Sequence, residues 1–159
     1  MIKRRETALT FVLKGLIPYT RPNLLLSFRP NQFFNELEKI SRYNTAQLRN
    51  AYNYAQRKKL ITVHKERLPE ISFAGRMHVE PFIAKKLGRQ GRLMVIFDIP
   101  EEIKSKRDSF RRFLQRLEFT QIQQSVWMSR YDYKDFVQEA ITVYELDDMV
   151  QLYEAARLT

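Results

Sequence analysis

The sequence predicts an α+β protein of two unlike halves, in which helices with a hairpin are followed by strands that alternate with helices. Hydrophobic residues make up 44% and aromatic residues 13% of the 159 positions, which is enough for packed cores. Helical spacing of apolar residues dominates the first half, whereas a continuous apolar strand opens the second. Between them, Leu87-Gly-Arg-Gln-Gly-Arg92 holds two of the four glycines. We therefore expect domains at residues 1–90 and 91–159.

The excess positive charge is confined to the first half. The formal net charge is +10. Residues 1–91 hold 18 Lys and Arg against 6 Asp and Glu, a net of +12, whereas residues 92–159 hold 10 against 12, a net of −2. A basic half joined to a nearly neutral half predicts a module that binds a polyanion, and nucleic acid is the commonest such partner. A membrane surface or an acidic protein is the alternative.

Composition excludes several kinds of chemistry. The chain has no cysteine, which excludes disulfides, thiol catalysis and thiolate zinc sites. Its two histidines, His64 and His78, are too few and too far apart for a histidine metal cage. No apolar run reaches the ~20 residues of a membrane span, and no cleavage site follows the basic start. We therefore expect a cytoplasmic protein without a signal peptide or a membrane partner.

Three helices and a hairpin are predicted in the first half. Apolar periodicity and cap residues place the first helix up to Pro18, the second after an Asn31 cap and the third after Asn44 or Thr45. Two β-prone runs joined by a charged segment follow, and a last helix leads to the boundary. The predicted ranges are helices 6–17, 31–40, 45–60 and 79–87, with strands 60–63 and 71–73.

This order is that of a winged helix-turn-helix, whose third helix fits the major groove of B-DNA. The outer side of that helix carries amide and guanidinium groups, which pair with adenine and guanine edges, and the hairpin carries cations for phosphates. A merely solvated face, or a surface that binds protein, is the alternative. The candidate DNA-binding residues are Thr45, Gln47, Arg49, Asn50, Asn53, Tyr54, Arg57, Lys58, Lys65 and Arg67.

The second half has the order of a ferredoxin-like βαββαβ domain. An apolar strand at 93–97 precedes an amphipathic helix at 101–117, and a strand-like stretch at 121–129 is a hairpin or a long bent strand. A second helix at 133–144 and a strand at 149–153 complete the order. Helices cover one face of such a sheet, so we expect a second subunit on the other. Trp127, Val126 and Tyr153 are the candidate dimer-interface residues; for Trp127 the core is the alternative, and base stacking is another.

Five segments of this half carry a resemblance to a known family: Leu93-Met-Val-Ile-Phe-Asp-Ile-Pro-Glu-Glu102, Lys106-Arg-Asp108, Arg111-Arg-Phe-Leu114, Gln123-Gln-Ser-Val-Trp-Met-Ser129 and Tyr131-Asp-Tyr133. They resemble the middle domain of PaaX-type repressors of phenylacetate degradation, which is similar to the small nuclease of the CRISPR adaptation machinery. The resemblance implies a repressor that acts as a homodimer on double-stranded DNA. The family also begins with a winged helix. Its longer members have a C-terminal extension that is absent here, so we expect no small-molecule effector, although the sequence leaves one open.

Asp98 is the one candidate for catalysis or metal binding. In the CRISPR nucleases, an Asp at the end of the first strand binds magnesium near the dimer axis, and Asp98 matches that position. A magnesium-dependent nuclease is therefore one alternative function, and a DNA-bending scaffold in a CRISPR-like complex is another. An Asp before Ile-Pro also caps turns, so we expect DNA binding without catalysis, without a cofactor and without a bound metal.

Overall fold

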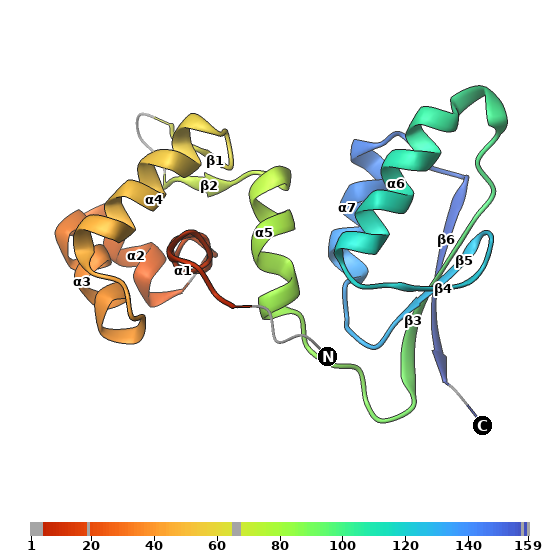
Figure 1. Ribbon diagram of the computed structural model, residues 1–159, viewed down its shortest axis with the longest axis horizontal. Coiled ribbons are helices and arrows are strands. Elements are labelled where there is room, and N and C mark those ends of the chain that lie inside the picture. Colours follow the sequence, from red (N-terminus) through yellow and green to blue (C-terminus); the bar gives the residue numbers. More distant parts are fainter. Residues whose placement is uncertain (1–4, 19, 65–67, 157, 159) are drawn as a thin grey trace. The chain divides into compact units, whose positions relative to one another are not determined.

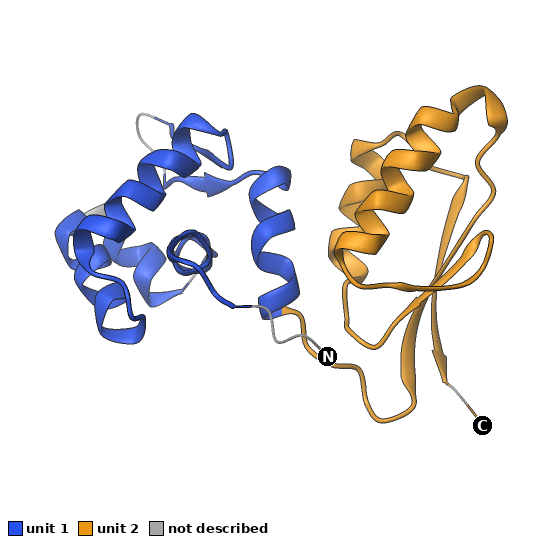
Figure 2. Cartoon of the chain, in the orientation of Figure 1, with its two compact units in different colours: residues 1–83 blue, residues 84–159 orange. Residues whose placement is uncertain are grey.

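The computed structural model describes residues 5–18, 20–64, 68–156 and 158, apart from the side chains of residues 27 and 28. The chain divides into two compact units, residues 1–83 and 84–159 (Figure 2). Helices predominate in the amino-terminal unit, and a four-stranded sheet with two helices forms the carboxyl-terminal unit. The α+β class expected from the sequence is confirmed.

The amino-terminal unit places four helices before a small antiparallel hairpin and one helix after it (Figure 1). Its core lies between α1, α3 and α4, where Leu13, Phe33, Leu37 and Leu48 are almost fully buried. Burial of such side chains contributes roughly 1.5–3 kcal/mol each, which holds the helices together. The elements are α1 (Ala8–Gly15), α2 (Arg21–Phe28), α3 (Pro30–Ile40), α4 (Thr45–Arg57), β1 (Ile61–Thr62), β2 (Glu70–Ile71) and α5 (Phe73–Ile83).

Helix α2 was not expected from the sequence, which predicted three helices before the hairpin rather than four. Thr20 caps it by accepting the backbone N–H of Asn23, and Pro22 stands in the first turn. The buried Asn23 side chain donates to the carbonyl of Leu16 at 3.2 Å, which ties the helix to the end of α1. Apolar periodicity missed α2 because its apolar residues form no continuous stripe, although Thr20 and Pro22 are a start signal.

Two helix starts differ from the predicted ones. Helix α3 begins at Pro30 after Arg29, so Asn31 does not cap it. Helix α5 begins at Phe73 rather than near residue 79, because the Ser72 hydroxyl accepts the backbone N–H of Gly75 and donates to the carbonyl of Lys59. Phe73, which the sequence assigned to a strand, therefore belongs to the first turn of a helix.

The carboxyl-terminal unit has the predicted βαββαβ order. All its strand pairs are antiparallel in the sheet order β4-β5-β3-β6, and α6 and α7 lie on one side of the sheet (Figure 1). The side chains of Leu93, Val95 and Phe97 face these helices and are buried. The elements are β3 (Gly91–Phe97), the 3₁₀ helix η1 (Glu101–Ile103), α6 (Lys104–Arg116), β4 (Thr120–Gln123), β5 (Val126–Ser129), α7 (Lys134–Val143) and β6 (Val150–Ala156).

Residues 84–90 belong to the carboxyl-terminal unit, whereas the sequence placed them before the boundary. The backbone N–H of Leu87 donates to the carbonyl of Arg130, and that of Asp132 donates to the carbonyl of Lys85, each at 2.8 Å. Lys86 and Tyr131 form an antiparallel bridge between these contacts. Backbone pairing to a segment about 45 residues later in the chain carries no local sequence signal, which is why glycine placement set the boundary a few residues late.

Candidate nucleic-acid interface

Helix α4 has one buried side and one exposed side, as its sequence pattern predicts. Asn44 caps it by accepting the backbone N–H of Gln47 at 2.9 Å, and the Gln47 side chain accepts the N–H of Asn44 in return. Leu48 and Ala55 are fully buried in the core of the amino-terminal unit. Their burial fixes the rotation of the helix about its axis, which determines the residues that solvent reaches.

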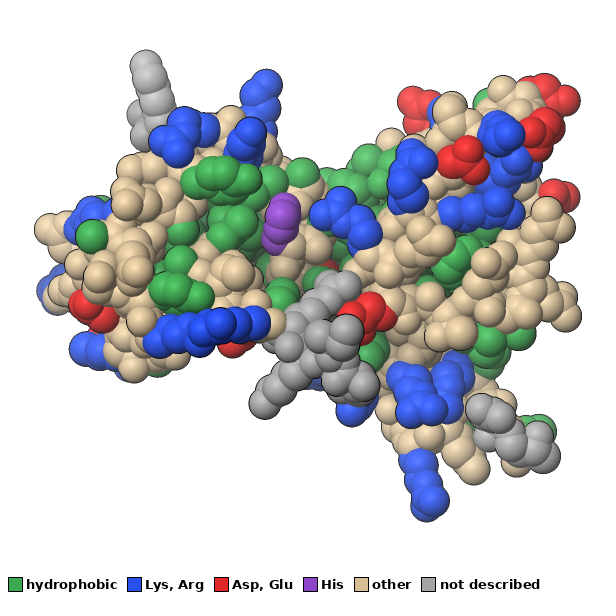
Figure 3. All heavy atoms as spheres, viewed as in Figure 1, with side chains coloured by type: hydrophobic (Ala, Val, Ile, Leu, Met, Phe, Trp, Pro, Cys, Tyr) green, Lys and Arg blue, Asp and Glu red, His purple; other side chains and the backbone are tan. Residues whose placement is uncertain are grey.

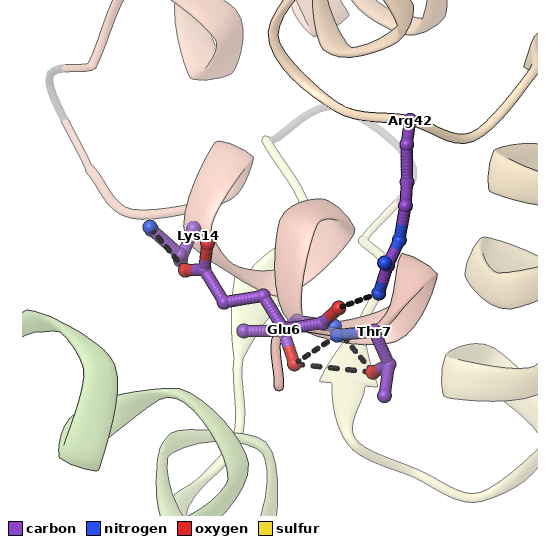
Figure 4. A network of polar contacts seen from close by, with 5 residues as sticks. Glu6, Thr7, Lys14 and Arg42 are labelled. Carbon is purple, nitrogen blue, oxygen red and sulfur yellow. Dashed lines mark hydrogen bonds and ion pairs between the residues drawn. The ribbon is translucent and has the colours of Figure 1, made fainter. Parts of the chain in front are cut away.

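The turn between α3 and α4 is held to the start of α1 by a polar network (Figure 4). The carbonyl of Glu6 accepts from the Tyr43 hydroxyl at 3.3 Å and from the Arg42 guanidinium at 3.5 Å. The Glu6 carboxylate pairs with Lys14 at 2.6 Å, and Thr7 caps α1. These contacts join the turn before α4 to the start of α1.

Two of the predicted DNA contacts are already engaged within the unit. Gln47 uses its side-chain oxygen in the cap of α4. Arg49 donates to the Asn31 side chain at 2.9 Å, and its guanidinium lies 4.5 Å from the ring centre of Phe34. Both side chains are exposed, but Arg49 links α4 to α3, so a base contact by Arg49 requires that link to break.

Three other predicted contacts form a stripe on the exposed side of α4. Asn50, Asn53 and Arg57 recur at i, i+3 and i+7, and all three are exposed. None of their side chains has a hydrogen bond or ion pair within the described residues. Their amide and guanidinium groups are the kinds that make paired hydrogen bonds with base edges.

The ends of α4 hold the remaining candidates. Tyr54 is 42% exposed, Lys58 is exposed and Thr45 is half-buried in the first turn. Lys59 was not among the predicted contacts, but it is exposed beside Lys58. The basic run Arg57-Lys58-Lys59 in the sequence could have indicated it. The predicted contacts Lys65 and Arg67 lie outside the described residues.

The cations of α6 are partly neutralised by nearby acids. Arg107 pairs with Glu101 at 2.6 Å, Lys104 approaches the same carboxylate at 3.8 Å, and Lys106 pairs with Glu145. The hydrogen bond from Arg107 holds the pKa of Glu101 below its usual range, and the one from Lys106 does the same for the pKa of Glu145. The basic sequence of α6 thus overstates the positive potential at its surface.

Asp98 is exposed just after the end of β3. Its backbone N–H donates to the carbonyl of Met149 at 2.9 Å. Within the described part of the chain, no group of three or more His, Asp or Glu side chains is arranged to hold a metal ion. The acidic residues that the sequence offers as possible neighbours of Asp98 are Glu101, Asp108 and Asp132, and they do not form such a group with it.

The three predicted interface residues lie on opposite faces of the sheet. Trp127 is opposite the buried Val95, faces the helices and is 2% exposed, so the choice between core and interface resolves to core. Val126 pairs with Ile96, and Tyr153 pairs with Met94, on the face that α6 and α7 leave open. Adjacent residues of a strand lie on opposite faces, so Trp127 and Val126 could not both belong to one interface on the sheet, and the prediction that grouped them overlooked this alternation.

Comparison with known protein families identifies the second part of the chain. Residues 91–159 match the family described as the PaaX protein central Cas2-like domain. The carboxyl-terminal unit is similar to this PaaX central domain over those residues. The match confirms the resemblance noted in the sequence. Neither the curated proteins nor the solved structures contain a significant match to the chain.

The matched residues contain Asp98, the cations of α6 and the open sheet face, whereas α4 lies outside them. The family match therefore gives no information about the stripe on α4, whose description rests on the structure alone. Among the described residues, no helix combines the length and apolar character that crossing a membrane requires.

Proposed function

We propose that the protein is a sequence-specific regulator of transcription, a repressor, that binds double-stranded DNA as a homodimer. The amino-terminal unit acts as a winged helix, with α4 in the major groove and the β1–β2 hairpin beside the phosphate backbone. The PaaX central domain supplies the dimer contact. No cofactor is needed for this function.

The exposed stripe on α4 is the observation that carries the proposal. Asn50 and Asn53 offer amides that match adenine, and Arg57 offers a guanidinium that matches guanine. These groups have no partner within the described residues, so DNA does not have to displace an internal contact. The positive charge of residues 1–91 adds attraction to phosphates.

Dimerisation is supported by the open face of the sheet. Met94, Ile96, Val126 and Met128 are only half-buried there, and Tyr153 is 44% exposed. A second copy of the same apolar face would cover these side chains. Two linked DNA-binding units raise affinity through effective concentration and lead us to expect a palindromic operator, with half-sites one or more helical turns apart.

The decisive experiment is a binding selection on genomic fragments in the presence of Mg²⁺ at ~150 mM salt, which suppresses non-specific phosphate binding. We expect recovery of one palindromic motif on intact duplexes. Fragments without a shared motif would contradict sequence-specific regulation, and cleaved fragments would favour the nuclease alternative.

The motif from this selection allows a test of the stripe. Asn50→Ala and Arg57→Ala each reduce discrimination between operator and scrambled duplex by about 1–3 kcal/mol, because each removes one paired contact to a base. Gln56→Ala, on another exposed part of α4, is the matched control and leaves discrimination unchanged. If all three variants distinguished operator from scrambled duplex as well as the wild-type protein does, α4 would not belong to the DNA interface.

A further inference from the structure

We propose that the loop leading into β3 forms a second contact surface for the phosphate backbone of duplex DNA. This inference rests on the proposed DNA binding and adds a site in the carboxyl-terminal unit. Lys and Arg side chains gather around this loop, at the lower end of that unit in Figure 3. The surface, named here the β3-loop patch, consists of Lys85, Lys86, Arg89, Arg92 and Arg130.

Backbone contacts hold the β3-loop patch in a defined shape. The backbone N–H of Leu87 donates to the carbonyl of Arg130 at 2.8 Å, and the antiparallel bridge between Lys86 and Tyr131 continues this pairing. Gly91 closes the loop by donating to Gly88 at 2.9 Å. Arg92 and Arg130 each adjoin the Leu93–Ser129 pair of the sheet. The cations are therefore grouped on a fixed frame rather than spread along a loose linker.

The charges of the patch are not neutralised within the described residues. Lys85, Lys86, Arg89 and Arg130 are exposed, and Arg92 is half-buried. None of the five is in an ion pair with a described carboxylate. The neighbouring Asp132 accepts the backbone N–H of Lys134 and is in no ion pair with a described cation, so its single negative charge reduces the positive charge of the patch without cancelling it.

The side-chain contacts that the patch does make leave its charge available. Arg92 donates to the carbonyl of Gly91 at 2.7 Å, which neutralises no charge. Lys86 lies 6.0 Å from the ring centre of Tyr131, at the outer limit of a cation–π contact.

Three cations of α6 differ from those of the β3-loop patch because they are already paired. Lys104, Lys106 and Arg107 on α6 each have a carboxylate partner in Glu101 or Glu145. A paired cation gains less from a phosphate because it must first give up its partner. The net charge of −2 for residues 92–159 conceals the patch, since three of its five cations precede residue 92.

Unpaired lysine and arginine side chains bind phosphates by releasing condensed counterions, about 0.9 per contact on B-DNA. Such contacts position a protein on the duplex without selecting a sequence. The β3-loop patch therefore increases affinity for all duplexes alike, whereas the stripe on α4 distinguishes among them.

The test compares full-length variants that lose equal charge. The patch variant carries Lys85→Gln, Lys86→Gln and Arg89→Gln, all at exposed positions. The control carries Lys104→Gln, Lys106→Gln and Arg107→Gln, the three cations of α6 that are paired with carboxylates. Fluorescence anisotropy measures binding to a pool of random-sequence duplexes between about 50 and 300 mM salt. Circular dichroism and urea unfolding verify that all three proteins are folded.

We expect the patch variant to bind roughly 100-fold more weakly at ~150 mM salt, with a plot of log affinity against log salt shallower by about 2.7. The control should change both quantities far less. Equal losses in the patch variant and the control would overturn the inference and would indicate a general charge effect. An unchanged patch variant would also overturn it, while leaving the proposed function intact. A wild-type protein that binds no duplex would overturn both.

Discussion

At the scale of single residues, close contacts decide which side chain a position accepts. Gly75 lies where α5 passes the end of α4, and a Cβ atom there would stand 2.1 Å from the carbonyl oxygen of Leu60. That oxygen belongs to the backbone and accepts the N–H of Ser72, so it cannot move away cheaply. A glycine is required because two backbone segments meet, not because the backbone angles are unusual.

Gly75→Ala is expected to destabilise the amino-terminal unit by about 1–3 kcal/mol, the usual cost of forcing extra atoms into a packed site. Urea unfolding followed by far-UV circular dichroism should show the loss as an earlier helical transition. Fluorescence of Trp127, the only tryptophan, monitors the carboxyl-terminal unit and should keep its midpoint. Gly88→Ala is the control, since nothing lies within 4 Å of its added Cβ. Equal midpoints for both variants would contradict the close contact.

At the scale of elements, three helices end in the same way without glycine. Lys59, Glu118 and Glu145 each have a positive φ just after the last turn of α4, α6 and α7. The following residue in each case is buried and donates its N–H back to the helix, as Leu60 does to Ala55 at 2.9 Å. This is the hydrogen-bond pattern of the Schellman motif, in which the buried side chain offsets the cost of the left-handed residue.

Lys59→Gly should therefore stabilise the amino-terminal unit by about 0.5–1 kcal/mol, since φ is 55° at this position and glycine adopts that region without strain. Lys58→Gly removes the same charge one residue earlier, where φ is −86°, and should destabilise the unit by about 0.5–1 kcal/mol. Thermal unfolding of the two variants at one pH measures both effects. Stabilisation by both, or by neither, would contradict the backbone explanation.

At the scale of the whole molecule, the chain pairs a basic helical unit with a unit that is similar to the PaaX central domain and whose sheet has an open face. We propose different functions for the two units: α4 selects the sequence, the β3-loop patch adds affinity for any duplex, and the open face joins two copies. Separate surfaces predict separable defects, because a variant of one surface leaves the contacts of the others in place.

Tyr153→Lys should convert the proposed dimer into a monomer, because a two-fold interface contains the substitution twice and would bury two unpaired charges. Val143→Lys is the matched control, since Val143 on α7 is 50% exposed and Tyr153 is 44% exposed. Light scattering after size-exclusion chromatography measures the mass against 19.2 kDa for one chain. A wild-type monomer, or a Tyr153→Lys dimer, would refute this interface.

The sequence alone determined most of the elements and the surface that carries the proposed function. Apolar periodicity located α1, α3, α4, α6 and α7 to within a few residues, because one-sided burial requires that spacing. It also identified Asn50, Asn53 and Arg57 as exposed, since the same periodicity that buries Leu48 and Ala55 turns these residues outward. Charge counts and the motifs after Leu93 pointed to the basic half and to the PaaX resemblance, which the family match confirms.

Only the tertiary structure decided which of those side chains are already engaged. The partner of Arg49 is Asn31 on α3, and that of Lys106 is Glu145 after α7; both partners are distant in sequence. The same holds for the unit boundary, where residues 85–87 pair with residues 130–132. Burial and exposure follow from local periodicity, but ion pairs and strand pairing depend on which distant segments meet, and no local pattern in the chain specifies that meeting.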